Sequence, residues 1–185
     1  ITFTRAVTLG GAVVLDTGAN AGNILFSATV ATGGNNLTLD AGDTGNITLG
    51  ALTGNGALTV TDGNVQTYAV LTVAALTISD ATTSVTFGGA ITATGATDID
   101  AGGTIALNAA MSGTTIAIDA AGLTTVAAAG DITASGVVGF GASKTGLLTT
   151  SGNITTTNDA ITFTRAVTLG GAVVLDTGAN AGNIL

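Results

Sequence analysis

The sequence ITFTRAVTLGGAVVLDTGANAGNIL occupies residues 1–25 and occurs again, letter for letter, at residues 161–185. This identity defines a repeat with a period of 160 residues. Apolar residues alternate with Thr within it, as in ITFT, which is typical of short β-strands with one buried face. We therefore interpret residues 1–160 as one full unit and residues 161–185 as the start of the next, in a single continuous solenoid.

A shorter and more degenerate period divides the unit into eight segments with a mean length of about 20 residues. The pattern restarts at Ile161, and the segments open at Ile1, Ile24, Ile47, Val65, Val85, Ile105, Thr124 and Leu147. Such a period predicts an all-β fold, a right-handed parallel β-helix (β-solenoid) of about 20 residues per coil and about nine coils. We expect the second unit to continue in the same phase, with a rise of about 38 Å per unit at about 4.8 Å per coil.

The first strand of each coil predicts a column of large apolar side chains inside the solenoid. Alternation places one residue inward and the next outward, so Gln66 and Tyr68 are expected to lie outward with Val65 inward. The expected inward column consists of Phe3, Phe26, Leu49, Phe87 and Leu107.

An Asp recurs about once per coil, where a strand ends and a Gly- and Asn-rich turn follows. This turn ladder comprises Asp16, Asp40, Asp62, Asp80, Asp100 and Asp119. Asp tolerates left-handed backbone and caps its own turn, so a structural role is the favoured interpretation. Ca²⁺ binding is the alternative, with Asp40 and Asp43, and Asp98 and Asp100, as the candidate ligand pairs.

Composition excludes several classes of function. The net charge is −8, and only Arg5, Lys144 and Arg165 are basic, so there is no basic patch for nucleic acid. We expect Arg5 and Arg165 to be isolated, solvated cations, with pairing to an Asp of a neighbouring coil or unit as the alternative. The chain has no His and no Cys, which removes the usual pairings of a catalytic base with a nucleophile. We therefore expect that it is not an enzyme. We also expect no cofactor other than the Ca²⁺ considered above. No apolar run approaches the roughly 18 residues of a membrane span.

Ice binding by a flat Thr-x-Thr face was a further possibility for a Thr-rich solenoid. Only one coil carries Thr at both expected outward positions of the first strand. The pairs are Thr2/Thr4, Leu25/Ser27, Thr48/Gly50, Gln66/Tyr68, Thr86/Gly88 and Ala106/Asn108. The sequence therefore disfavours an ice-binding face on this strand.

Three stretches carry a resemblance to a known group of proteins. ITFTRAVTLGGAVVLDTG at 1–18, LTLDAGDTGNI at 37–47 and GNITL at 45–49 resemble large repetitive bacterial surface proteins of the filamentous-haemagglutinin and β-strand-repeat type. The resemblance covers the whole chain. It implies a right-handed parallel β-helix, secretion to the cell surface, and roles in adhesion, biofilm matrix or fibres.

Two functions remain open from the sequence. The first is a structural segment of a secreted, self-associating fibre, stalk or biofilm matrix, whose partner is itself, end to end along the solenoid axis. The alternative is a surface adhesin whose solenoid face or distal module binds a host, a surface or a carbohydrate. The scarcity of aromatic and basic residues favours the fibre, because these residues dominate binding hot spots. Neither end shows a capping element, so we expect the chain to form filaments.

Overall fold

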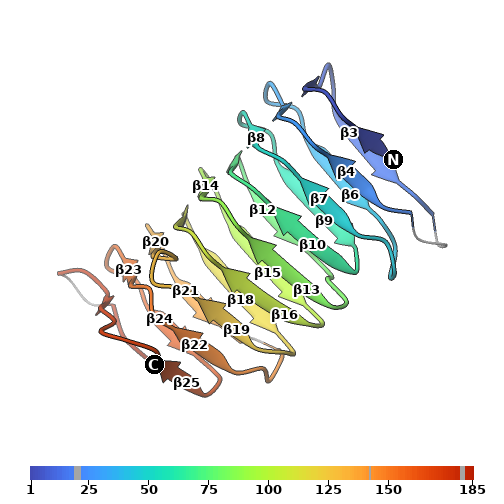
Figure 1. Cartoon of the computed structure of the whole chain (residues 1–185). Coiled ribbons are helices and arrows are strands. Elements are labelled where there is room, and N and C mark those ends of the chain that lie inside the picture. The colour runs from blue at the N-terminus through green and yellow to red at the C-terminus, as the bar shows by residue number, and fades with distance from the viewer. Residues whose placement is uncertain (19–21, 142, 180–181) are drawn as a thin grey trace.

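The alternating segments form short strands, and each strand pairs in parallel with its counterpart one coil later. The structure, a computed structural model, describes residues 1–18, 22–141, 143–179 and 182–185. Within these ranges the fold is all-β, without a helix, and winds as a β-solenoid of about eight turns of about 21 residues. Figure 1 shows the coils stacked along one axis, with the two termini at opposite ends. This confirms the all-β solenoid predicted from the repeat.

Three parallel sheets, named here A, B and C, form the sides of the solenoid. Among the described residues, sheet A contains β1 (Thr2–Phe3), β4 (Ile24–Phe26), β7 (Ile47–Leu49), β10 (Val65–Tyr68), β13 (Ser84–Phe87), β16 (Thr104–Leu107), β19 (Thr124–Val126), β22 (Leu148–Thr150) and β25 (Val167–Leu169). Sheet B contains β2 (Val7–Thr8), β5 (Val30–Ala31), β8 (Leu52–Thr53), β11 (Leu71–Val73), β14 (Ile91–Ala93), β17 (Met111–Gly113), β20 (Ile132–Ala134), β23 (Ile154–Thr156) and β26 (Leu175–Asp176). Sheet C contains β3 (Val13–Asp16), β6 (Leu37–Asp40), β9 (Leu58–Asp62), β12 (Leu76–Ile78), β15 (Thr97–Ala101), β18 (Ile116–Ala120), β21 (Val138–Phe140) and β24 (Ile161–Phe163).

The larger inward residues of sheet A form a continuous column beside a second inward column. The strand register aligns Phe3 with Phe26, and the column continues through Leu49, Tyr68, Phe87 and Leu107. The rings of Phe3 and Phe26 stack with centroids 4.6 Å apart, and those of Tyr68 and Phe87 stack at 5.3 Å. The five residues expected to share a column therefore lie in one, with Tyr68 inserted between Leu49 and Phe87.

Gln66 and Tyr68 point inward, contrary to the expectation that they lie outward. Both side chains are fully buried, whereas Val65 is half-buried and Thr67 is exposed. The alternation of a strand forces a choice between burying Gln66 with Tyr68 and burying Val65 with Thr67. Burying the Tyr68 ring removes the larger apolar area from water, and the Gln66 amide then satisfies the buried hydroxyl.

The second copy of the repeated sequence does not continue in the expected phase. ITF at residues 1–3 contributes β1 to sheet A, whereas the same letters at 161–163 form β24 in sheet C. Each coil contributes one strand to each of the three sheets, so a unit that kept its phase would span a multiple of three strands. In the described residues β24 follows β1 by 23 strands, which is not a multiple of three. The 14 residues from 147 to 160 hold only two strands, β22 and β23, so Ile161 begins on the third side of its coil.

The same I-T-F strand places its Phe ring on another Phe ring in two different sheets. Phe163 stacks on Phe140 in sheet C with ring centroids 5.5 Å apart, as Phe3 stacks on Phe26 in sheet A. Each side of the coil requires only alternation and a short turn, so an I-T-F strand satisfies sheet A or sheet C. The second copy therefore begins one side short of eight full coils from the first.

Candidate functional site

A buried ion pair lies where the second unit meets the first. Asp119 lies in β18, and Arg165 follows β24. Nη2 of Arg165 lies 2.6 Å from Oδ1 of Asp119, and the two side chains are 1 % and 11 % exposed. Nη1 of Arg165 also donates to Oγ1 of Thr124 at 3.4 Å. Arg165 is therefore not the isolated, solvated cation expected from the sequence, whereas its copy Arg5 is exposed.

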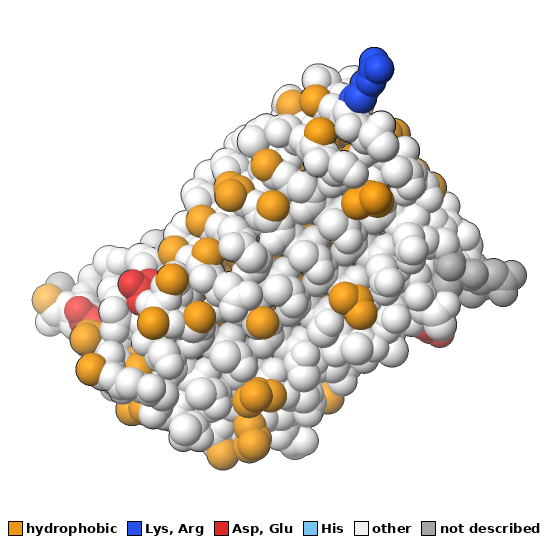
Figure 2. Space-filling view, viewed as in Figure 1, with side chains coloured by type: hydrophobic (Ala, Val, Ile, Leu, Met, Phe, Trp, Pro, Cys, Tyr) orange, Lys and Arg blue, Asp and Glu red, His pale blue; other side chains and the backbone are white. Residues whose placement is uncertain are grey.

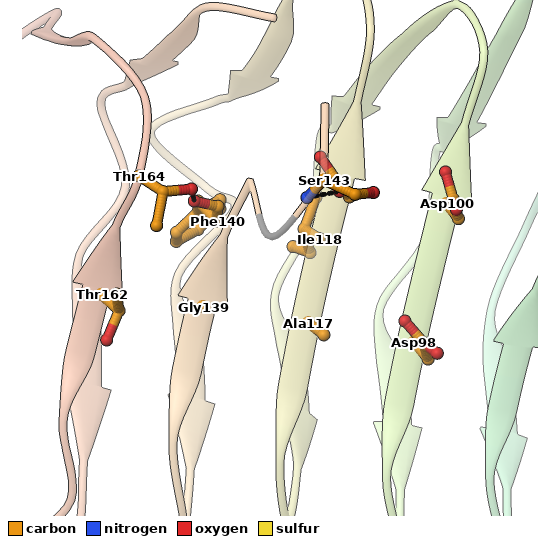
Figure 3. Close-up of a pocket in the computed structure, with 10 residues that line it drawn as sticks. Asp98, Asp100, Ala117, Ile118, Gly139, Phe140, Ser143, Thr162 and Thr164 are labelled. Atoms are coloured by element: carbon orange, nitrogen blue, oxygen red, sulfur yellow. Dashed lines mark hydrogen bonds between the residues drawn. The ribbon is translucent and has the colours of Figure 1, made fainter. Parts of the chain in front are cut away.

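The connection between β21 and β22 completes the surroundings of Asp119. The backbone N–H and the hydroxyl of Ser143 donate to Oδ2 of Asp119 at 2.6 and 2.7 Å, and the N–H of Lys144 donates at 3.0 Å. Figure 3 shows Ser143 hydrogen-bonded at the edge of the pocket. Burial raises the pKa of Asp119, but the bonds from Ser143 and Lys144 and the charge of Arg165 outweigh it, so this pKa lies below its ordinary value.

A hollow of about 250 Å³ lies beside this ion pair on sheet C. Ala117 and Gly139 line it together with the exposed Asp98, and Thr162 of the second unit closes one side (Figure 3). Lys144 forms an ion pair with Asp100 on the same strand as Asp98. Asp100 is thus engaged with a cation of the chain itself.

A second hollow gathers acidic residues near the other end of sheet C. Asp16, Asp40, Asp43 and Asp62 line it together with two glycines. Oδ1 of Asp16 accepts from the N–H of Gly18 at 2.6 Å, and Oδ1 of Asp40 accepts from that of Gly42 at 3.1 Å. Both glycines have positive φ, at 75° and 68°, which an L side chain adopts only with strain. These contacts are the ones expected of Asp residues that cap their turns.

Asp62 shares this hollow with a like charge. Burial raises the pKa of Asp62, and the hydrogen bond and negative charge of Asp43, with the charge of Asp80, raise it further. The carboxyl group of Asp62 therefore keeps its proton to a higher pH than an ordinary Asp does.

The predicted Asp residues fall into separate groups. Asp16, Asp40 and Asp62 are in register, with a bulge at Asp40, and Asp100 is in register with Asp119. Asp80 follows the end of β12 and lies outside the strand. Of the Ca²⁺ candidates, Asp40 and Asp43 share a hollow, whereas Asp98 is exposed and Asp100 contacts Lys144. Within the described ranges, no group of three or more acidic residues is arranged to hold a metal ion.

Sheet B carries a feature that the sequence reasoning missed. Thr72, Thr92, Ser112, Thr133 and Thr155 are in register, one per coil, between inward neighbours. Four exposed hydroxyl residues form a second row directly after the ends of β14, β17, β20 and β23, at Thr94, Thr114, Ser135 and Thr157. Hydroxyl residues two positions apart thus recur at the second strand of four coils, although only Thr92 with Thr94 and Thr155 with Thr157 are Thr at both positions.

The fold and these contacts define the class of the chain, a tandem-repeat parallel β-solenoid. Comparisons with protein-family models, with curated proteins and with solved structures give no match to this chain. In the part of the chain that the structure describes, no helix is long and apolar enough to cross a bilayer.

Proposed function

We propose that this chain is a structural segment of a secreted extracellular fibre, stalk or biofilm matrix that associates with itself along the solenoid axis. The observation that carries the proposal is the unbroken junction between the two units. Strands β24, β25 and β26 of the second unit pair in parallel with β21, β22 and β23 of the first. A unit that stacks on a copy of itself in this way adds length without a new kind of interface.

The side surfaces support a role in spacing rather than in lateral fusion. Figure 2 shows apolar side chains scattered among polar ones over the visible face. Outward positions of sheet A are largely Thr, as at Thr48, Thr67 and Thr86, which suits a solvated sheet face. The net charge of −8 repels neighbouring solenoids side by side. Growth along the axis is then favoured over lateral aggregation.

The test is the state of the purified 185-residue chain. Light scattering over a range of concentrations should show growth to high mass, and negative-stain electron microscopy should show thin unbranched filaments. A monomer that persists at high concentration, with intact β-content by circular dichroism, would contradict the proposed function.

The hydroxyl rows of sheet B favour a second candidate, an adhesin whose face binds carbohydrate. Hydroxyl groups held in rows on a rigid sheet donate and accept hydrogen bonds, which suits the hydroxyl groups of an extended polysaccharide chain. Binding to insoluble cellulose or chitin should fall in a Thr92→Val, Thr133→Val variant. The matched control is Thr67→Val, Thr86→Val on sheet A. Equal binding by both variants would rule out sheet B as the adhesive face.

A further inference from the structure

We propose that copies of this chain join by exchanging identical segments. In one copy, residues 161–178 pack on the coil that β21, β22 and β23 form, a surface that we call the seat. Residues 1–18 of a second copy fit the same seat. The inference rests on the proposed self-association and specifies its joint. In a chain that continues into further units, the same joint is made within the chain.

The seat holds its occupant through three kinds of contact. Ile161 is fully buried, and β24 pairs with β21 in parallel. The ring of Phe163 stacks on Phe140 at an interplanar angle of 12°. The guanidinium of Arg165 reaches Asp119 across the connection that carries Ser143 and Lys144. Apolar, backbone and ionic contacts thus all select this segment.

At the start of the chain Phe3 stacks on Phe26 and β1 pairs with β4 of the following coil, but Ile1 and Arg5 lack the contacts of Ile161 and Arg165. Ile1 is 44 % exposed, whereas Ile161 is 0 % exposed. Arg5 is exposed, whereas the side chain of Arg165 is 1 % exposed. Since the two segments have the same sequence, every contact that residues 161–178 make can be made by residues 1–18 of another copy. Exchange therefore buries the exposed Ile1 and supplies Arg5 with Asp119 as its partner.

The seat also fixes how the second copy is oriented. Residues 161–163 lie in sheet C, whereas residues 2–3 lie in sheet A. A copy that enters the seat must therefore place its sheet A on sheet C of the first copy. Successive copies are related by one third of a turn and by about seven and two-thirds coils, which is a rise of about 37 Å at about 4.8 Å per coil.

Cysteine cross-linking tests the seat, because the chain has no native Cys. Thr162 is in register with Gly139, so Thr2 of a seated second copy should lie beside Gly139 of the first. A Cβ added at Gly139 meets nothing within 4 Å, and neighbouring parallel strands lie within the Cα range of a disulfide. Thr2→Cys and Gly139→Cys chains would be refolded together with oxidised glutathione. A Gly139→Cys, Thr162→Cys chain is the control for geometry within one molecule.

The inference predicts a covalent heterodimer between Thr2→Cys and Gly139→Cys chains. Thr149 is the position that Thr2 would meet if the copies joined in the same phase, since Thr168 is in register with it. Cross-linking of Thr2→Cys to Thr149→Cys instead would contradict the rotation of one third of a turn between copies. It would still support self-association. Filaments without either cross-link would overturn the seat alone, whereas monomers without either would overturn the proposed function as well.

Substitutions at Arg5 and Arg165 distinguish binding in the seat from unspecific end-to-end stacking of copies. Arg5→Ala in the Thr2→Cys chain should lower the heterodimer yield at least about tenfold, because it removes the partner of a buried carboxylate. Arg165→Ala in the Gly139→Cys chain should raise the yield, because the resident segment loses its anchor. Equal yields in all three backgrounds would overturn the role of Asp119 in the joint.

Discussion

The hydroxyl of Tyr68 donates a hydrogen bond of 2.7 Å to Oε1 of Gln66, and both side chains are fully buried. Nε2 of Gln66 donates in turn to the backbone carbonyls of Asp80 at 2.6 Å and Gly63 at 3.3 Å. This chain of bonds lets a polar pair lie in two adjacent inward columns whose neighbouring residues are apolar, with Ile47 and Val85 beside Gln66 and Leu49 and Phe87 beside Tyr68. Burial also raises the pKa of Tyr68 far above its ordinary value, so the phenol stays neutral.

Removing the Tyr68 hydroxyl should destabilise the solenoid although the ring remains. Tyr68→Phe leaves Oε1 of Gln66 buried without a donor, which costs about 1–3 kcal/mol in the free energy of unfolding. Chemical denaturation with a double-mutant cycle including Gln66→Leu measures the coupling between the two side chains. Thr67→Val, an outward change on the same strand, is the control. Additive effects of the two single changes would show that the hydrogen bond is not made.

Arg5 and Arg165 occupy equivalent positions in the two copies of the repeat, so they allow a matched test of the ion pair at the unit junction. Arg165→Ala leaves the carboxylate of Asp119 buried with its strongest charge partner removed, so we expect a loss of about 3 kcal/mol. Arg5→Ala, in the same local sequence, should change the free energy of unfolding by less than about 0.5 kcal/mol. Unfolding of the dilute monomer, followed by circular dichroism, compares the two variants. Equal losses would mean that Arg165 is as solvated as Arg5.

The pKa of Asp119 gives this ion pair a defined pH dependence. The pKa is lower in the folded chain than the ordinary unfolded value of about 3.9, so the ionised form is favoured by folding. The resulting stability is present above the unfolded pKa and is lost as the pH falls through the folded pKa. Asp119→Asn should therefore destabilise the chain at neutral pH and lose less stability than the parent on acidification. Parallel stability curves from pH 7 to pH 2 would contradict this.

Asp62 should show the opposite pH dependence. Its pKa is raised, so its contribution is fully present below the unfolded pKa and is lost as the pH rises through the folded pKa. Asp62→Asn should stabilise the chain at neutral pH by removing the repulsion from Asp43, and the gain should shrink on acidification. Thermal unfolding at several pH values measures this, with Asp98→Asn, at an exposed position, as the control. A gain that does not depend on pH would exclude the Asp43–Asp62 interaction.

Phe87 tests the inward column directly. Phe87 is fully buried and stacks on Tyr68, so Phe87→Asp places an unpaired carboxylate in the core and costs several kcal/mol. Thr86→Asp, at the outward position next to it, should cost far less. Unchanged melting and β-content in Phe87→Asp would place residue 87 outside the solenoid.

The period and the alternation were enough to predict the fold. Every coil needs inward residues two positions apart and a turn whose residues tolerate its backbone conformation. Both features recur in the sequence about once in 20 residues. The phase of the second unit was harder to predict, because it depends on counting strands and not residues. The interval from 147 to 160 is long enough for two sides of a coil but not for three.

The candidate site was less predictable than the fold. Asp119 and Arg165 are 46 residues apart, and their contact depends on where the connection between β21 and β22 passes. The inward position of Gln66 depends on the buried hydroxyl of Tyr68, which a count of apolar residues does not include. The turn-capping contacts of Asp16 and Asp40 are local, two residues ahead in the chain, and short-range chemistry of this kind can be read from sequence.

Helical reconstruction of filaments by cryo-electron microscopy tests the central claim, that the solenoid continues from unit to unit and that each unit ends one side short of eight full coils. We expect a spacing of about 4.8 Å between coils and a unit rise of about 37 Å. Each unit should be turned by one third of a turn relative to the last, beyond the twist of the coils themselves, and the pattern of sides should return after three units. Units that superpose without this rotation, or filaments in which the strands run along the axis, would contradict the account.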